Sequence, residues 1–100
     1  MPKGYWVATA DVTNMDGWRG YMEANAAAFR KYNGKFLVRG GKNDPVEGKL
    51  RSRFVVIEFP DYDTALACYH SPEYQKAKVV RLPHGTMDVA VVEGYEGAQP

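Results

Sequence analysis

Apolar residues first recur at every second position of the chain and then, within the first thirty positions, at every third or fourth. Residues Tyr5 to Val12 alternate with a period of two and are rich in aromatic and β-branched side chains, which predicts a strand with two distinct faces. After Asn14 or Thr13, either of which can cap a helix, apolar residues recur at helical spacing. They are Met15, Trp18, Tyr21, Met22, Ala26, Phe29 and Tyr32. We expect this helix to end at Asn33 and Gly34, which tolerate a left-handed backbone.

The rest of the chain predicts three further strands and a second helical region. The strands are expected at residues 35–39, 54–59 and 87–93. Between the first two of these, residues Gly41 to Ser52 are polar and predict a long connection, a candidate lid or partner contact. A helix is expected from Asp61, and the sequence Ser71-Pro72-Glu73 is typical of a new helix start, so this helix should be broken in two.

The predicted order is strand, helix, strand, strand, helix, strand. With short connections it closes into an α+β, ferredoxin-like βαββαβ sandwich, an antiparallel sheet with both helices on one face, in a single domain of residues 1–100. Both alternating positions of the strands, however, carry large apolar residues, as in the runs 54–59 and 89–92. A second apolar sheet face would be a large exposed patch, and such patches usually mark association sites. The sequence therefore predicts a homodimer formed through the sheet faces.

Composition narrows the class of protein further. The chain has 100 residues, 45% of them hydrophobic, and a formal net charge of +1, as expected of one folded domain. Basic residues are spread among acidic ones, so no nucleic-acid partner is predicted. The single cysteine, Cys68, lies on a predicted helix face and reads as a buried structural thiol or, alternatively, a nucleophile. No signal peptide or membrane span is predicted, and we expect a cytoplasmic protein.

Four ordered segments also resemble a known family. They are GYWVATADV (Gly4 to Val12), KFLVRGG (Lys35 to Gly41), RSRFVVIEFPDYDTALACYHSPEYQ (Arg51 to Gln75) and VVEGYEG (Val91 to Gly97). Together they resemble the bacterial family known as domain of unknown function 1330. The resemblance implies a ferredoxin-like fold of the dimeric α/β-barrel superfamily and implies no activity. Relatives in that superfamily include small monooxygenases, haem-degrading oxygenases, lactone isomerases and ligand-binding domains, so the fold leaves the chemistry open.

Charged residues inside predicted strands are the first candidates for a functional site, because an unpaired buried charge is costly. Strict alternation places Lys35, Leu37 and Arg39 on one face of their strand. If Arg39 lies opposite Phe54, then Lys35 lies opposite Glu58 in an ordinary cross-strand ion pair. Alternatively, Arg39 binds a carboxylate or phosphate through its fork of donors.

A polar amide also interrupts the apolar face of the first helix. Asn25 follows Trp18 by seven residues and Tyr21 by four, so all three share one face. Asn25 either satisfies backbone groups in the core or points, with Trp18, Tyr21 and Trp6, into a cleft between helix and sheet. Clefts lined by aromatic residues with few polar groups are typical small-molecule sites, so this cleft is the leading place for a ligand.

The two histidines, His70 and His84, are the side chains whose usual pKa lies near neutrality. Both are predicted at a helix end or in a loop, where histidines are usually exposed. Two separated histidines without acidic residues at ligand spacing do not form a metal site, and neither a metal nor another cofactor is predicted.

Two main functions remain open. The first is a small enzyme acting on an apolar or aromatic, in part anionic, compound. In it His84 or Asn25 would handle a proton, Arg39 would hold an anionic oxygen, and Trp6, Trp18 and Tyr21 would form the walls. The second is a homodimeric ligand-binding module without catalysis. A third reading is an accessory subunit that contacts another protein through the loop Gly41 to Ser52.

Overall fold

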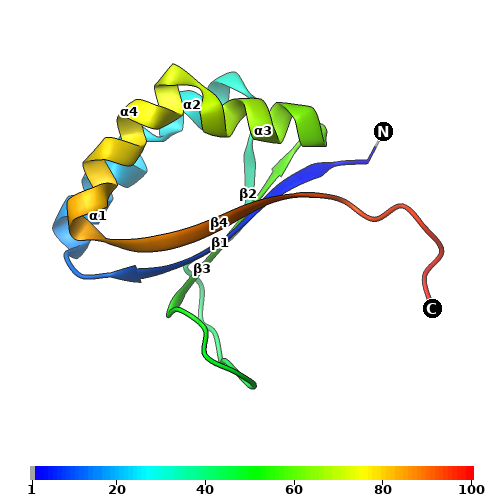
Figure 1. Cartoon of the computed structure of the whole chain (residues 1–100), viewed down its shortest axis with the longest axis horizontal. Helices are drawn as coiled ribbons and strands as arrows, with labels where there is room; N and C mark the ends of the chain where they lie inside the picture. Colours follow the sequence, from blue (N-terminus) through cyan, green and yellow to red (C-terminus); the bar gives the residue numbers. More distant parts are fainter. Residues whose placement is uncertain (1) are drawn as a thin grey trace.

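A four-stranded sheet carries all the helices on one of its faces (Figure 1). This computed structural model describes residues 2–100. Its elements, in chain order, are β1 (Gly4–Val12), α1 (Met15–Ala24), α2 (Ala26–Lys31), β2 (Lys35–Arg39), β3 (Arg53–Phe59), α3 (Tyr62–His70), α4 (Pro72–Arg81), the 3₁₀ turn η1 (Leu82–His84) and β4 (Gly85–Glu93).

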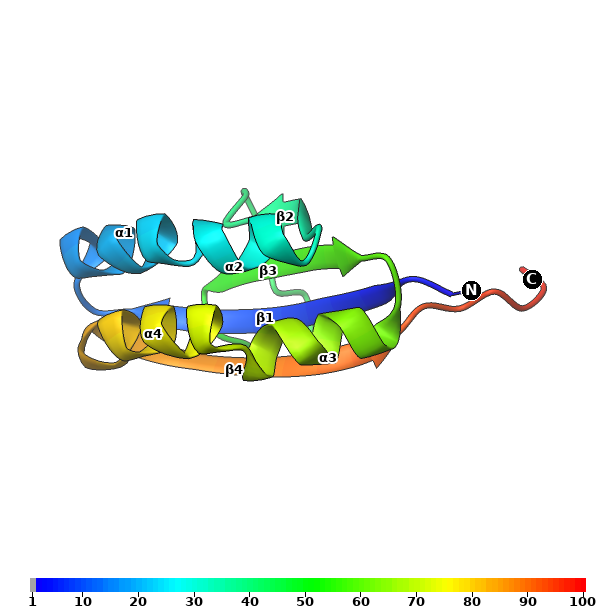
Figure 2. The same ribbon diagram turned by 90° about the horizontal axis from the view of Figure 1, so that it is seen from above.

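The strand order is β2-β3-β1-β4, and every neighbouring pair is antiparallel. The first and last strands of the chain, β1 and β4, are neighbours in the sheet. This is the ferredoxin-like arrangement predicted from the order of elements. Seen from above, α1 and α2 run beside α4 and α3 across the sheet (Figure 2). The predicted α+β fold is therefore confirmed. No helix within residues 2–100 has the length and apolarity needed to cross a membrane.

Local signals place most helix ends where the sequence predicts them. The Asn14 side chain accepts a hydrogen bond from the Gly17 amide at 3.2 Å and caps α1. At the other end, Asn33 takes a left-handed φ of 58°, and the Gly34 amide donates to the Phe29 carbonyl at 2.8 Å. This pair of features closes the helix C-terminus in a Schellman arrangement.

The first helical region differs from the prediction of one continuous helix. It is divided at Asn25, which separates α1 from α2 and retains a backbone φ of −74° and ψ of −13°. The Asn25 amide still donates to the Tyr21 carbonyl at 2.9 Å, so the break is a small change of direction. The second region is divided as expected: the side chains of Asp61 and Ser71 accept from Thr64 and Tyr74 amides and start α3 and α4.

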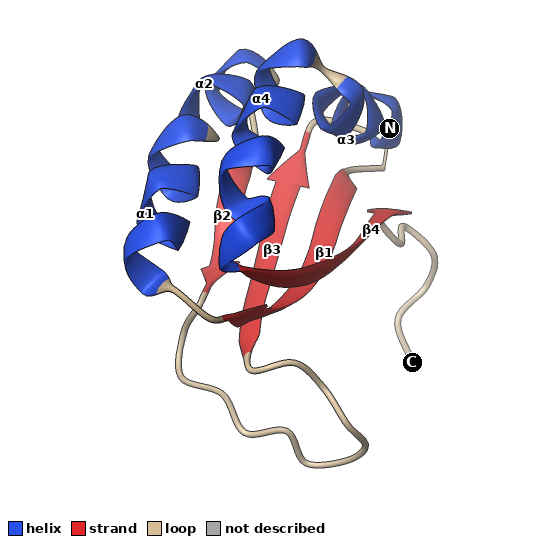
Figure 3. Cartoon of the chain, turned by 60° about the vertical axis from the view of Figure 1, so that its left-hand side comes forward, coloured by secondary structure: helices blue, strands red, loops and turns tan. Residues whose placement is uncertain are grey.

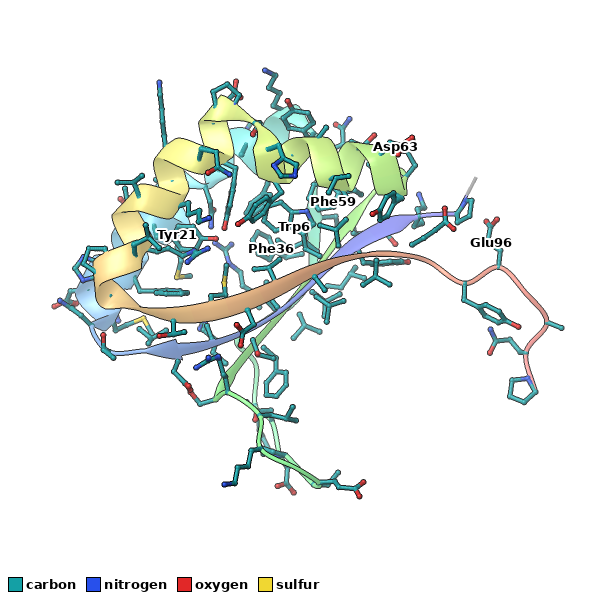
Figure 4. The ribbon with its side chains drawn as sticks, viewed as in Figure 1. Trp6, Tyr21, Phe36, Phe59, Asp63 and Glu96 are labelled. Carbon is teal, nitrogen blue, oxygen red and sulfur yellow. The ribbon has the colours of Figure 1, made fainter. Side chains whose placement is uncertain are left out.

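The core lies between the sheet and the helices and is dominated by aromatic rings. Trp6, at the centre of β1, packs with Phe29, Phe59 and Tyr74, with ring centroids 4.8–5.6 Å apart. Figure 4 shows Trp6, Phe36 and Phe59 in this layer beneath the helices. The Trp6 indole N–H donates to the Ala65 carbonyl at 2.8 Å, which ties α3 to the central strand. The pairs with Phe29 and Tyr74 are edge-to-face, an arrangement that aromatic rings prefer.

A bulge in β2 overturns the alternation expected for that strand. Lys35 lies opposite Glu58 as predicted, but Val38 lies opposite Val56 and Arg39 opposite Val55, so Leu37 is the extra residue. One extra residue exchanges the faces of everything after it. Arg39 therefore lies on the helix-covered face, with its guanidinium carbon 4.0 Å from the Phe36 ring centroid, and the prediction that it shares a face with Lys35 is wrong.

No helix of the described residues covers the opposite sheet face, which exposes apolar side chains. Among them Val7 is 45% exposed, Leu37 49% and Val92 44%. The connection of residues 40–52 reaches away from the helices at this side, as a long tan loop in Figure 3. The C-terminal end of this connection is attached to the sheet by Arg51, which donates to Asp11 and Asp88 at 2.9 and 2.8 Å. The exposed apolar side chains and this attached loop together form what we call the open face.

Candidate functional site

A small cavity lies between α1, α2 and the sheet. Its walls are apolar and aromatic except for three residues with amide or guanidinium groups. The lining is formed by Trp6, Ala8, Trp18, Tyr21, Met22, Asn25, Phe29, Phe36, Arg39, Arg53, Val55, Ile57 and Met87. The enclosed free space is about 30 Å³, room for about two water molecules. A larger ligand therefore requires flexible wall residues to rotate.

Arg39 lies at the mouth of this cavity. It is an exposed residue that also borders a shallow surface depression together with Arg19, Met22 and Glu23. Its guanidinium stacks over Phe36, an arrangement in which an arginine keeps its donors in the ring plane free. Within residues 2–100 no carboxylate forms an ion pair with it. Arg39 thus presents a guanidinium without a direct ion pair at the opening, within the part of the chain that is described.

Arg53 is the second cation of the cavity. Since Arg53 lies opposite Ala10 in the β1–β3 ladder, it points to the helix-covered face, on the same side as Arg39. Burial and the nearby Arg39 charge both lower the pKa of Arg53. Among the described residues 2–100, its buried Nε has no hydrogen-bond partner, and Nη2 contacts the Met22 sulfur at 4.0 Å. An anion would relieve this unpaired charge.

The conformation of Arg53 depends on a glycine. A Cβ atom on Gly40 would collide with the Arg53 guanidinium, so that side chain lies directly against the Gly40 backbone. Gly40 also has a φ of 66°, a left-handed conformation that glycine adopts without strain. Gly40, the first residue after β2, therefore leaves room for the Arg53 guanidinium.

Asn25 contributes the buried amide. The residue is 4% exposed, and its Oδ1 has no hydrogen-bond partner within residues 2–100. Buried side-chain polar atoms are normally paired, so an orphan atom in a cavity wall needs an explanation. A ligand that donates a hydrogen bond, or a water molecule in the cavity, would satisfy it.

The comparisons with known proteins agree with this architecture. A family model described as "Domain of unknown function (DUF1330)" matches residues 3–95. The chain belongs to the DUF1330 family. No curated protein matches the chain at a significant level.

Solved structures extend the likeness of this DUF1330 member to the fold alone, at low sequence identity. A protein of unknown function from Rhodopseudomonas palustris has a TM-score of 0.71 at 11% identity, covering 96% of this chain and 85% of that chain. SnoaB, a cofactor-independent oxygenase from Streptomyces nogalater, has a TM-score of 0.65 at 14% identity, covering 100% and 97%. A dimeric protein of unknown function with a ferredoxin-like fold from Bacteroides fragilis has a TM-score of 0.59 at 13% identity, covering 91% and 95%.

The cavity of this family member contains five residues singled out from the sequence. They are Trp6, Trp18, Tyr21, Asn25 and Arg39. The sixth, His84, is not among the lining residues: its imidazole lies against Gly17 at the start of α1, and its carbonyl accepts from the Thr13 and Asn14 amides. Its role as a proton-handling group of the cavity therefore has no geometric support.

Lys35 and Glu58 lie opposite one another as expected, but they do not form the expected ion pair within residues 2–100. Glu58 instead accepts a long hydrogen bond, 3.4 Å, from the Tyr5 hydroxyl on the open face. The cross-strand ion pair therefore does not account for Arg39, which lies on the other face.

Sequence reasoning missed Arg53. The signal was present, because Arg53, Val55, Ile57 and Phe59 alternate with a period of two and so share a face with the core residues of β3. Beginning the strand at residue 54 removed Arg53 from that pattern. Its closeness to Arg39 could not be read from spacing, since it depends on the bulge.

Within residues 2–100, neither the lone cysteine nor the metal-binding residue types supply a further site. Burial raises the pKa of the Cys68 thiol to about 12, which fits the structural thiol predicted from its helix face and leaves it unreactive at neutral pH. Across residues 2–100 no three histidine, cysteine or acidic side chains lie close enough to hold a metal ion.

Proposed function

We propose that this protein binds a small apolar or aromatic anion in the cavity between sheet and helices. The observation that carries the proposal is the pair Arg39 and Arg53, two guanidiniums on one aromatic cavity without a carboxylate partner within residues 2–100. Bringing two like charges together is unfavourable unless a counter-charge is bound. A carboxylate matches the planar fork of a guanidinium, and the aromatic walls match an apolar body.

Calorimetric titration with benzoate and with benzamide, its neutral analogue of the same shape, tests this proposal. We expect benzoate to bind at least about tenfold more tightly than benzamide and to weaken as salt is added. Replacing both cations, Arg39→Met with Arg53→Met, should weaken benzoate binding about 100-fold, since each charge-assisted hydrogen bond contributes about 1.5 kcal/mol.

The matched control is Arg30→Met, which removes an exposed arginine of α2 that does not line the cavity. It should leave benzoate binding unchanged. Equal affinities for benzoate and benzamide, an unchanged double variant, or no benzoate binding at millimolar concentration would each refute the proposal.

A second candidate function is chemical transformation of the bound compound. It is favoured by the likeness in fold to SnoaB, which is described as a cofactor-independent oxygenase. The polar lining residues are arginine, asparagine and tyrosine, and the cavity wall within residues 2–100 holds no carboxylate, imidazole or thiol as a ready base. This composition favours binding over catalysis. The test is oxygen uptake with a hydroxylated aromatic acid as the substrate. Uptake above the buffer rate with wild type, but not with the double arginine variant, would support catalysis.

We also propose a homodimer through the open face. The support is the apolar character of that face, where Val7 and Val38 flank Val56 on its two sides, and the likeness to a Bacteroides fragilis protein described as dimeric. Light scattering at micromolar concentration should give twice the monomer mass. Val7→Arg with Val38→Arg should give a monomer, whereas Val79→Arg, on the exposed side of α4, should remain dimeric; a monomeric wild type would refute the proposal.

A further inference from the structure

Arg81 is a buried charged residue that does not line the cavity and lies behind the cavity wall. Arg81, the last residue of α4, is 4% exposed, and within residues 2–100 no carboxylate pairs with it. Its buried Nε also has no hydrogen-bond partner in the part of the chain that the structure describes. A buried guanidinium without a carboxylate costs several kcal/mol unless other acceptors surround it.

The side chains beside Arg81 include two tyrosines, Tyr21 and Tyr74. Its guanidinium carbon lies 5.6 Å from the centroid of the Tyr21 ring. Burial acts to lower the pKa of Arg81, but the Tyr74 and Tyr21 hydroxyls counter it and the pKa is raised. The two hydroxyl oxygens are 2.9 Å apart and share one hydrogen bond. Arg81, Tyr74 and Tyr21 thus form one buried array between α1 and α4.

Counting protons in this array leaves one hydroxyl free. A guanidinium has donors only, so Arg81 cannot accept either hydroxyl proton. One proton fills the bond between Tyr21 and Tyr74, and the other needs an acceptor outside the array. Tyr74 is fully buried and does not line the cavity, whereas Tyr21 does. A free proton on Tyr74 would have no acceptor in filled space, which is costly; on Tyr21 it has the cavity.

We propose that Tyr74 donates to Tyr21 and that Tyr21 therefore presents its hydroxyl proton to the cavity, as a fixed donor for an oxygen atom of the ligand. This assignment rests on the proposed function for the ligand and on the geometry of the array for the proton. Tyr74 and Arg81 are then positioning residues that act through Tyr21. Burial raises the pKa of Tyr74, so it keeps its proton over the whole physiological range and remains the donor.

The ligand class becomes narrower in consequence. In the expected ligand, an anionic group binds the arginines and an apolar body packs against the aromatic rings. A carbonyl or other acceptor oxygen on that body accepts a hydrogen bond from Tyr21. We expect an aromatic carboxylate with a second oxygen substituent to bind better than its hydrocarbon analogue. Met22 and Arg53, two flexible side chains in contact with each other, are the wall residues that can rotate to admit it.

A pair of nearly isosteric compounds tests this donor. Wild type should bind 4-acetylbenzoate about tenfold more tightly than 4-isopropylbenzoate, which has no acceptor oxygen on the substituent. In Tyr21→Phe the ratio should fall to about one while the affinity for 4-isopropylbenzoate changes less than about twofold. Arg81→Met and Tyr74→Phe should reduce the ratio in part, and Arg81→Lys should retain more of it than Arg81→Met. A tenfold ratio that persists in Tyr21→Phe, or no preference in wild type, would overturn the assignment.

A ligand-free measurement separates this inference from the proposed function. Tyr21→Phe leaves the Tyr74 proton without an acceptor in the core, whereas Tyr74→Phe leaves a Tyr21 proton that water in the cavity can accept. The melting temperature of Tyr21→Phe should therefore be lower than that of Tyr74→Phe by about 4 °C. The reverse order would reject the proton assignment. Failure of benzoate and both substituted benzoates to bind, with the expected order of melting temperatures, would reject the proposed function alone.

Discussion

Arg53→Met should make the ligand-free protein more stable and the binding site weaker. The change removes a buried Nε that has no hydrogen-bond partner and a charge placed beside Arg39. An unsatisfied buried donor costs about 1 kcal/mol or more, while the repulsion between these partly exposed guanidiniums is screened to about 0.5 kcal/mol or less. Methionine has a similar length and is flexible enough to keep the contact with Met22. We expect a net gain of about 1 kcal/mol.

Binding should respond in the opposite direction. Loss of one charge-assisted interaction with the anion removes about 1.5 kcal/mol, which corresponds to a roughly tenfold weaker benzoate Kd.

Two assays on the same variant measure the two effects. Circular dichroism should show a melting temperature about 4 °C higher for Arg53→Met, because 1 kcal/mol shifts a domain of this size by about that much. Calorimetry should show the weaker benzoate Kd. Arg30→Met, the exposed control, should change neither value. If Arg53→Met is destabilised, the guanidinium has a structural partner in solution; if its benzoate Kd equals that of wild type, Arg53 is not part of the site. Either result would refute the reasoning.

Three further predictions concern the cavity wall, the long loop and a helix end. Met22→Ala should strengthen binding of 4-isopropylbenzoate several-fold in calorimetry, because it enlarges a cavity of about 30 Å³ without removing a polar contact to the ligand. The Ser52 amide and Arg51 lower the pKa of Asp11 from 3.8, so attachment of the loop is complete above about pH 4 and weakens as the pH falls further. The protection of the amides of residues 40–52, measured as the exchange rate relative to the intrinsic rate at the same pH, should then decrease in wild type and be low at all pH values in Asp11→Asn. Asn33→Ala should cost about 1 kcal/mol in denaturant unfolding and Asn33→Gly should cost nothing, because the residue has a φ of 58°.

Features that depend on neighbouring residues alone were predictable from the sequence. The caps at Asn14, Asp61 and Ser71 form as expected, because a short polar side chain before a helical pattern can reach the free amides of the first turn. The break at Asn25 was missed. An asparagine inside an apolar face gives no spacing signal for a helix division, since the break retains the usual backbone hydrogen bond to Tyr21.

The candidate site was predictable in its apolar part and not in its charged part. Trp18, Tyr21 and Asn25 share a helix face by simple periodicity, and Trp6 shares a strand face with Ala8, so their convergence beneath the helices follows once the fold is known. The direction of Arg39 does not follow. Alternation assigns it to the side of Lys35, and only the bulge at Leu37 moves it to the side of Arg53.

By itself, the sequence determined the order of elements, the antiparallel ferredoxin-like sheet and its family, because these depend on period, caps and turn residues that act over a few positions. Tertiary structure alone decided which charges meet. A one-residue bulge reverses the face of every residue after it at little local cost, and its position is set by how β2 fits β3 across the sheet. The same holds for Arg81, Tyr74 and Tyr21, which come from α4 and α1 and become one array only where those helices pack together.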